Sequence, residues 1–328
     1  MRVDVVIPSY NYARFLEDCV GSVLSQEGVE VRALIIDDCS GDDTFEVGTN
    51  HARRDNRVLF RRHSQNRGHI ATYNEGLLEW AEAEYALLLS ADDVLAPGAL
   101  RRATDVMDAC RNVGMCYGLQ TTFCREIPTA DGRVAEYARH EVVKGEEFLE
   151  IACRGGSNPV ATPTALVRTD LQRRIGGYRK TLPHTGDLEM WLRFAAHASI
   201  GRIDAVQAYK REHANNMVKQ FTDTIVPDLQ QRMLAFESAL CGCRELVRDA
   251  AGLLRLARAS LAEEAFWSAN RVFENGKGEL VQELLEMAAE WDSAWRSRPA
   301  WQRFEWKRRA GLRAWRMVEP VVTFLRPR

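Results

Sequence analysis

Two adjacent carboxylates, Asp92 and Asp93, follow an apolar segment at residues 85–90, and these side chains are well suited to chemistry. The apolar run predicts a buried strand, which delivers both carboxylates to its carboxyl end. In open α/β sheets, ligands bind at this end of the strands. A pair of carboxylates there suits a hard divalent cation, which usually bridges to a phosphate. In the alternative interpretation, the pair caps a helix that begins near Pro97 and extends to Arg111.

The elements before this segment indicate a mainly parallel sheet. Apolar runs predict strands at residues 3–7 and 31–36, and apolar residues at helical spacing predict helices at residues 13–26 and 69–81. Polar, turn-forming residues follow both strands, at Pro8–Asn11 and at Asp37–Thr44. Strands that alternate with helices form βαβ units. The carboxyl ends of the three strands therefore share one edge of the sheet.

Five segments, in order along roughly residues 1–220, resemble the motifs of inverting family-2 glycosyltransferases. They are the start of the chain from Val5 to Asp42, then Asn66–Gly76, Ser90–Asp93, Gly186–Arg193 and Arg211–Asn216. Two positions depart from the family pattern. Ala91 stands first in the Asp-x-Asp-type metal motif, and Gly186 stands where many members have Glu. The last Asp of each motif is present. Each motif alone is weak, and their order and spacing make the resemblance specific.

The resemblance implies a GT-A fold, which is a Rossmann-like, mainly parallel sheet flanked by helices. It also implies a nucleotide-diphosphate sugar donor, which we expect to be UDP-linked. Pro8 and Tyr10 are implied to hold the nucleotide base, and Asp38 to accept a hydrogen bond from it. Arg67 is implied to lie near the base or the diphosphate.

The resemblance assigns the remaining site residues to metal binding and catalysis. Asp93 is implied to be the direct ligand of Mn²⁺ or Mg²⁺, and Asp92 to contact the ribose or the metal shell. His213 is implied to touch the diphosphate or the metal. Asp187 is implied to be the general base that takes the proton of the acceptor hydroxyl. One base and one displacement invert the anomeric centre.

Asp187 has two alternative interpretations in the sequence. It stands at the start of a predicted helix, so it could simply cap that helix. The other four motifs favour the base. Glu189 is the alternative base, and because it lies two residues further on, it points to a different face of the helix.

The motifs and the composition predict three parts. Residues 1–110 form the nucleotide-sugar-binding part, residues 111–225 the acceptor-binding and catalytic-base part, and residues 226–328 a helical extension. In the second part we expect a strand at 113–123, a hairpin turn at 130–133, a helix at 145–153 and a strand at 158–167. The acceptor is expected to be a saccharide, a lipid-linked molecule or a natural product.

The implied activity places the chain in surface polysaccharide or glycosylated natural-product biosynthesis. The alternative is a non-catalytic scaffold, with a degenerate transferase fold and helices that recruit partners. A net charge of −2 over 328 residues gives no signature of nucleic-acid binding. The chain starts in a strand, without a signal peptide, and no apolar run is long enough to span a bilayer. We therefore expect a protein of the reducing cytoplasm, with its eight cysteines mostly packed in the core.

The helical extension is rich in tryptophan and in basic residues. Six of the eight tryptophans follow residue 266. Residues 296–328 contain ten Lys or Arg and two acidic residues, hence a net charge of +8, so the rest of the chain carries −10. A helical hairpin that buries the tryptophans would explain the pattern. So would a homodimer interface, or a peripheral contact with the inner face of a membrane.

Overall fold

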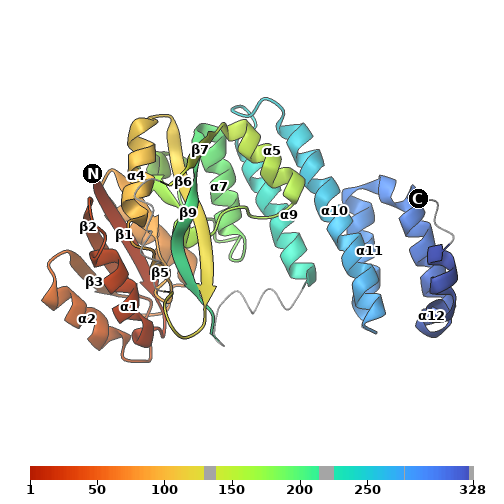
Figure 1. Cartoon of the computed structure of the whole chain (residues 1–328), viewed down its shortest axis with the longest axis horizontal. Helices are drawn as coiled ribbons and strands as arrows, with labels where there is room; N and C mark the ends of the chain where they lie inside the picture. The colour runs from red at the N-terminus through yellow and green to blue at the C-terminus, as the bar shows by residue number, and fades with distance from the viewer. Residues whose placement is uncertain (129–137, 214–224, 277, 325–328) are drawn as a thin grey trace.

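The computed structural model describes residues 1–128, 138–213, 225–276 and 278–324, and these residues form a mixed nine-stranded sheet flanked by helices (Figure 1). The strands are β1 (Arg2–Ser9), β2 (Glu30–Asp37), β3 (Val58–Arg62), β4 (Tyr85–Leu88), β5 (Val94–Leu95), β6 (Val113–Phe123), β7 (His140–Val143), β8 (Leu166–Arg168) and β9 (Ser199–Arg211). Their order is β3-β2-β1-β4-β8-β6-β9-β5, and β7 pairs with β9. Strands β3, β2, β1 and β4 are parallel, as the sequence predicts, and β8 is antiparallel to both β4 and β6.

Helices cover the sheet and continue beyond it. They are α1 (Ala13–Leu24), α2 (Thr44–Arg54), α3 (His69–Asn74), the π-helix η1 (Glu75–Trp80), α4 (Ala99–Ala109), α5 (Gly145–Gly155), the 3₁₀-helix η2 (Thr162–Thr164), α6 (Thr169–Ile175), α7 (Gly186–His197), α9 (Ile225–Gly242), α10 (Ala250–Glu274), α11 (Glu279–Trp291), the 3₁₀-helix η3 (Ser293–Ser297) and α12 (Pro299–Phe324). In β1, Val5 and Ile7 belong to one buried cluster and Val6 to another. The strand is buried on both faces, which explains its continuous apolar sequence.

Two helices differ from the sequence prediction near the carboxyl edge. The helix expected at 97–111 starts at Ala99, after Gly98 (φ 70°), and β5 separates it from Asp93. Asp92 and Asp93 are therefore not its cap, and that interpretation is wrong. The helix expected at 69–81 changes to a π-helix at Glu75. A Cβ on Gly76 would lie 2.2 Å from the Val6 side chain, so this glycine lets the helix approach β1 closely.

The second part of the chain follows the prediction less closely. Strand β6 and helix α5 are where the sequence places them. The strand expected at 158–167 is wrong, because this stretch contains the 3₁₀-helix η2 and only the short strand β8. Pro163 lacks a backbone N–H and cannot complete a strand ladder. The hairpin turn expected at 130–133 lies outside the described residues.

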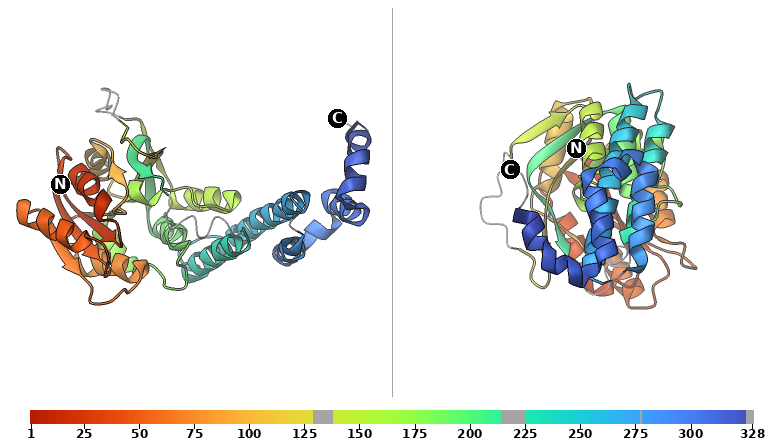
Figure 2. Two further views of the ribbon diagram at one scale, coloured as in Figure 1. Left: turned by 90° about the horizontal axis from the view of Figure 1, so that it is seen from below. Right: turned by 90° about the vertical axis from the view of Figure 1, so that its right-hand side faces the viewer.

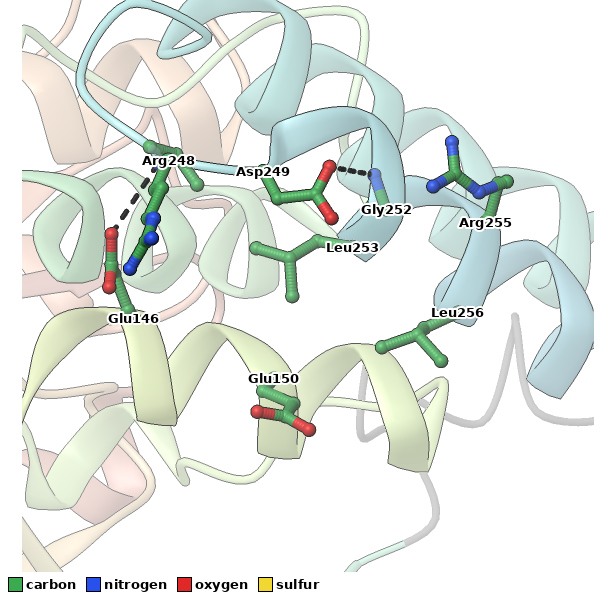
Figure 3. A pocket seen from close by; sticks show the side chains of 9 residues that line it. Glu146, Glu150, Arg248, Asp249, Gly252, Leu253, Arg255 and Leu256 are labelled. Carbon is green, nitrogen blue, oxygen red and sulfur yellow. Dashed lines mark hydrogen bonds between the residues drawn. The ribbon is translucent and has the colours of Figure 1, made fainter.

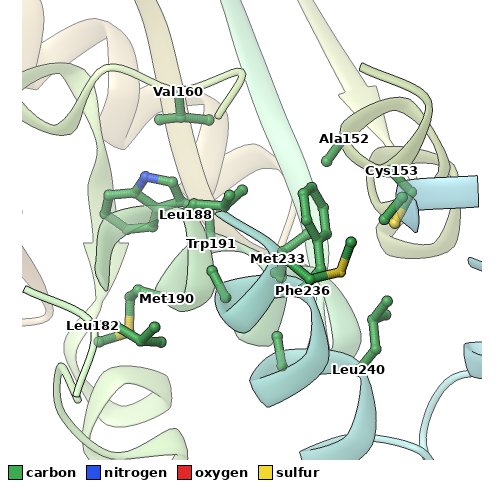
Figure 4. Close-up of a cluster of buried hydrophobic side chains, with 14 of the residues drawn as sticks. Ala152, Cys153, Val160, Leu182, Leu188, Met190, Trp191, Met233, Phe236 and Leu240 are labelled. Carbon is green, nitrogen blue, oxygen red and sulfur yellow. The ribbon is translucent and has the colours of Figure 1, made fainter. Parts of the chain in front are cut away.

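Helix α9 packs into the same hydrophobic core as helix α7. Met233, Phe236 and Leu240 of α9 lie beside Leu188 and Trp191 of α7 (Figure 4). All five side chains are nearly fully buried. The buried cluster therefore continues from α7 into the predicted extension. The three-part division of the chain stays a prediction.

The tryptophans of the last helices are only partly covered. Trp295 is buried and stacks on Phe266, as does the half-buried Trp301, with ring centroids 4.7 and 5.7 Å apart. Trp267 and Trp306, however, are 46% and 73% exposed. The expected burial of all these tryptophans in a helical hairpin is wrong. Figure 2 shows α12 at the end of the molecule opposite to strands β1–β3.

We expect a chain truncated after residue 224 to aggregate, whereas a chain truncated after residue 298 stays folded. The first truncation removes α9 and uncovers α7, and each large apolar side chain that loses its burial costs about 1.5–3 kcal/mol. Several such losses approach the whole stability of a domain, roughly 5–15 kcal/mol. The second truncation removes only α12. Gel filtration and thermal unfolding of both chains test this, and a soluble 1–224 fragment would show that α9 is dispensable.

Candidate active site

The loops that follow β1 and β2 are tied together at the carboxyl edge of the sheet. Asn11 (φ 59°) accepts a hydrogen bond through its Oδ1 from the backbone N–H of Gly41, at 2.8 Å. Its own N–H donates to Ser40 Oγ at 2.9 Å. Tyr10, which precedes Asn11 and is 49% exposed, is therefore held next to the loop that contains Asp38. An exposed aromatic ring can pack on a nucleobase, and a buried carboxylate beside it can accept a hydrogen bond from that base.

Asp92 and Asp93 lie at the end of β4 and are both buried, at 7% and 6% exposed. Burial, followed by the neighbouring charge of Asp92, raises the pKa of Asp93 to about 8. The backbone N–H of Arg211 donates to Asp93 Oδ1 at 3.1 Å and partly offsets this rise. Two carboxylates that share a buried site raise the free energy of their ionised forms.

Arg211 and His213, at the end of β9, contact the same pair. The Arg211 guanidinium donates to the backbone carbonyl of Asp92 and to the carboxylate of Asp18, at 3.2 and 2.6 Å. It also lies 4.9 Å from the ring centroid of Phe15. His213 Nε2 is 3.0 Å from Asp92 Oδ2. The structure therefore brings His213 to the carboxylate pair.

The donor set at this edge fits a divalent cation bound together with a substrate. Among the residues that the structure describes, no group of three or more His, Cys, Asp or Glu is placed to hold a metal by itself. Mg²⁺ and ions like it are commonly held by one or two carboxylates plus substrate phosphates. Asp92 and Asp93 supply hard oxygen ligands, and the raised pKa of Asp93 shows that negative charge there is under-compensated.

Asp38 and Arg67 belong to a second cluster. The backbone N–H groups of Arg67 and Gly68 donate to the two oxygens of Asp38, at 2.7 and 2.8 Å. His63 Nδ1 also contacts Asp38 Oδ1, at 2.7 Å. The Arg67 guanidinium donates to Glu75 Oε2 at 2.6 Å. The structure thus joins Asp38 to the Arg67 loop.

Asp187 lies in the first turn of α7, whose N-cap is Thr185. Its Oδ2 accepts hydrogen bonds from Asn158 Nδ2 and Thr162 Oγ1, both at 3.0 Å, and its Oδ1 accepts from the backbone N–H of Leu188 at 2.8 Å. Burial raises the pKa of Asp187, and these hydrogen bonds offset part of the rise. The carboxylate is therefore held in place and is more basic than an exposed aspartate.

Tyr73 of α3 lies within electrostatic range of both carboxylate sites. Burial, then the charge of Asp187, then that of Asp92, raise the pKa of its hydroxyl. Its ring contacts Tyr178, with centroids 5.5 Å apart.

Glu189, the alternative base, is fully buried and fully paired. Arg179 Nε donates to its Oε1 at 2.6 Å, and Arg193 Nε to its Oε2 at 2.9 Å. Ser238 of α9 donates to the same carboxylate. Its oxygens are occupied by these donors and shielded from solvent, so they do not face an acceptor hydroxyl. Its contacts hold α7 and α9 together.

Several residues at these sites were not nominated from the sequence. Arg211 could have been found, because it opens the segment that contains His213. Glu75 lies within the motif segment Asn66–Gly76 and could have been found there, whereas His63 belongs to no motif, although a histidine directly after a strand is a weak signal. Asn158 and Thr162 lie in the stretch expected to be a strand.

A cavity of about 510 Å³ lies elsewhere, between α5 and the start of α10 (Figure 3). Its lining includes Glu146, Glu150, Arg248 and Arg255, so its charge is mixed. None of the nominated site residues lines this cavity. We assign it no role in the chemistry above.

Solved structures show the same fold. TarS of S. aureus, in complex with UDP-GlcNAc, superimposes with a TM-score of 0.61 over 88% of this chain and 79% of its own, at 17% identity. The mannosyltransferase PcManGT of Pyrobaculum calidifontis, in complex with GDP-Man and Mn²⁺, gives 0.53 over 88% and 85%, at 16% identity. At such identities the likeness concerns the fold, and it confirms the GT-A prediction.

The chain belongs to glycosyl transferase family 2, whose family model matches residues 4–168. An uncharacterized protein of Mycobacterium tuberculosis, MT1568, is 27% identical over 205 residues, which are 60% of this chain and 63% of that protein. The teichuronic acid biosynthesis glycosyltransferase TuaG of Bacillus subtilis, a putative assignment, is 32% identical over 32% of this chain and 41% of its own. Each of these alignments covers less than two thirds of the relative.

Proposed function

We propose that this chain transfers a sugar from a nucleotide-diphosphate donor, with UDP as the nucleotide, to an acceptor hydroxyl with inversion. The observation that carries the proposal is the buried pair Asp92–Asp93 at the end of β4. The raised pKa of Asp93 supports a site that takes a cation and the diphosphate together. Family membership and the complexes of fold relatives with UDP-GlcNAc and GDP-Man support the donor class.

The donor nucleotide is proposed to lie across the ends of β1 and β2. Pro8 and the exposed ring of Tyr10 pack against the base, and Asp38 accepts its hydrogen bond. Arg67 stands near the base or the diphosphate. Each carboxylate oxygen accepts two hydrogen bonds readily. Asp38 Oδ2 receives one from Gly68, which leaves capacity for the base.

The acceptor hydroxyl is proposed to lose its proton to Asp187. The raised pKa of this carboxyl brings its basicity nearer to neutral pH, where a general base works best. Asn158 and Thr162 both donate to Oδ2 and orient the carboxylate, whereas Oδ1, which accepts from the backbone N–H of Leu188, keeps a lone pair for the proton. Attack from the side of Asp187, opposite to the departing diphosphate, inverts the anomeric centre.

Mn²⁺ or Mg²⁺ is the proposed cofactor. Asp93 would be its direct ligand, with Asp92 and His213 in its surroundings. When bound, such an ion neutralises the charge that develops on the departing diphosphate. Arg211 adds a fixed positive charge beside the same carboxylates.

Calorimetric titration with UDP, dTDP and GDP, each with Mn²⁺ and with EDTA, tests the donor class. Tight and metal-dependent binding of one nucleotide would support the proposal. Slow hydrolysis of the matching nucleotide sugar would then exclude a non-catalytic scaffold. Binding of none of the three would overturn the donor site. We place the activity in surface polysaccharide or glycosylated natural-product biosynthesis, and TuaG is the relative that supports the first of these.

We further propose that α12 contacts an anionic membrane surface from the side of Trp306. None of the described helices is long and apolar enough to span a membrane. Trp306 is 73% exposed, and the exposed Arg303 and Arg309 lie three residues before and after it, on the same side of the helix. Aromatic and basic side chains on one helix face suit an anionic interface.

Sedimentation with vesicles is expected to show binding to phosphatidylglycerol-containing membranes and none to pure phosphatidylcholine. Each basic residue near an anionic surface contributes about 1 kcal/mol, so the variant Arg303→Gln/Arg309→Gln should bind at least tenfold more weakly. Trp267→Ala, which alters an exposed tryptophan of α10, is the matched control. Equal binding by the double variant would contradict the proposal, and a concentration-dependent dimer in analytical ultracentrifugation would favour a homodimer interface instead.

A further inference from the structure

His63 lies between two buried carboxylates. It directly follows β3, and its backbone N–H donates to the carbonyl of Asp37 at 2.9 Å. Its side chain is 6% exposed. Nδ1 lies 2.7 Å from Asp38 Oδ1, and Nε2 lies 2.9 Å from Glu75 Oε2. Both ring nitrogens therefore face a carboxylate oxygen.

The contact with Asp38 needs a proton on Nδ1 of His63. An ionised carboxylate only accepts hydrogen bonds, so the ring nitrogen that faces it must donate. Nε2 faces Glu75 Oε2 at 2.9 Å and Arg67 Nη1 at 3.5 Å. A hydrogen bond to an ionised carboxylate is charge-assisted, which is the strong kind.

The charged groups around His63 do not replace its contact with Asp38. Glu75 is paired with two arginines, because Arg67 Nη1 lies 2.6 Å from its Oε2 and Arg61 Nη1 lies 3.5 Å from its Oε1. Asp37, on β2, pairs with Arg62 at 3.3 Å. Among the described residues, His63 is the side chain that hydrogen-bonds to Asp38, and the other two contacts of that carboxylate are backbone N–H groups.

We infer that His63 is a positioning residue for the nucleotide site and holds the Asp38 carboxylate in its base-binding orientation. Oδ1 of Asp38 is occupied by His63 and by the backbone N–H of Arg67, and Oδ2 keeps a lone pair for the base. The inference rests on the proposed function, which assigns Asp38 to the nucleobase. It adds a residue outside the sequence motifs.

Calorimetric titration with two ligands separates positioning from a general structural role. UDP carries the base and pyrophosphate does not, so both are titrated with Mn²⁺ into wild type and His63→Gln. Loss of a hydrogen bond to a charged group is expected to weaken UDP binding about tenfold, with pyrophosphate binding unchanged. The matched control is His51→Gln, because His51 is also buried and lies 3.3 Å from a carboxylate, that of Glu17. The control should bind both ligands like wild type.

The outcomes distinguish this inference from the proposed function. UDP affinity of His63→Gln equal to wild type, or equal weakening for UDP and pyrophosphate, overturns the inference alone. A wild type that binds none of UDP, dTDP and GDP overturns both the donor site and the inference.

Nitrogen NMR of the wild type tests the hydrogen bond directly and requires no variant. With ¹⁵N-labelled histidine, the His63 ring is expected to carry a proton on Nδ1, the nitrogen that lies 2.7 Å from Asp38 Oδ1. A ring protonated on Nε2 alone would overturn the inference even if His63→Gln failed to fold.

Discussion

Asp187→Asn is expected to abolish sugar transfer while UDP binding stays at the wild-type level. Asparagine keeps the size of the side chain and can still accept hydrogen bonds from Asn158 or Thr162, but it cannot take a proton. General-base catalysis contributes about 10²–10⁴-fold, so the transfer rate should decrease by that factor. Initial rates with the donor identified by calorimetry, and the UDP dissociation constant of the same variant, measure the two effects separately.

Glu189→Gln is the matched comparison for this variant. Glu189 lies on the same helix but is buried between Arg179 and Arg193. Removing one partner of a buried ion network costs about 3–5 kcal/mol, so this variant should lose stability and keep its rate per folded molecule. Near wild-type transfer by Asp187→Asn, or loss of chemistry in folded Glu189→Gln, would contradict the assignment of Asp187.

The pH dependence of the transfer rate also tests the assignment of Asp187 as the general base. A base acts only when it is deprotonated, and burial raises the pKa of Asp187 above the ordinary value of 3.8. The rate should therefore start to fall, as the pH is lowered, at a higher pH than an exposed aspartate would give. The residual activity of Asp187→Asn should lack this acidic limb.

The sequence predicts the parts of the site that follow from strand order. Asp38 and Asp92 each come directly after an apolar strand, and parallel strands bring their carboxyl ends to one edge. His63 also follows a strand, but its role depends on Glu75, whose direction is set where α3 becomes a π-helix. Nothing in the periodicity of residues 69–81 predicts that transition, because it depends on the close contact of Gly76 with Val6.

The same limit applies to the base and to the tryptophans. The spacing in the sequence predicts that Asp187 and Glu189 lie on different faces of the helix. It does not predict that Arg179 and Arg193 pair with Glu189, because the fold brings these arginines to it. Helical periodicity likewise predicts the C-terminal helices without telling which side is covered. Trp295 is buried against Phe266, whereas Trp306 remains exposed. Long-range packing decides both cases.

Asp93→Asn is expected to abolish metal-dependent nucleotide binding. The substitution keeps the shape of the side chain and removes the charge that would bind Mn²⁺ or Mg²⁺. Wild type should bind UDP with Mn²⁺ and lose this binding in EDTA, whereas the variant should bind weakly in both. Asp105→Asn, on the exposed face of α4, changes the net charge equally and should behave like wild type.

Thermal unfolding without metal shows whether the loss is specific. The pKa of Asp93 is about 8 in the fold and near 3.8 in the unfolded chain, so the folded state binds the extra proton. Its ionisation therefore lowers stability as pH rises through this window, by an amount on the order of a few kcal/mol.

Asp93→Asn removes that cost and should melt at a higher temperature than wild type above about pH 8 in EDTA. Added Mn²⁺ should raise the melting temperature of wild type and leave the variant unchanged. A variant that is both less stable in EDTA and stabilised by Mn²⁺ would show that Asp93 serves the fold and that the ion binds elsewhere. If the variant is more stable in EDTA and no longer responds to Mn²⁺, Asp93 lowers the stability of the fold and serves to bind the ion.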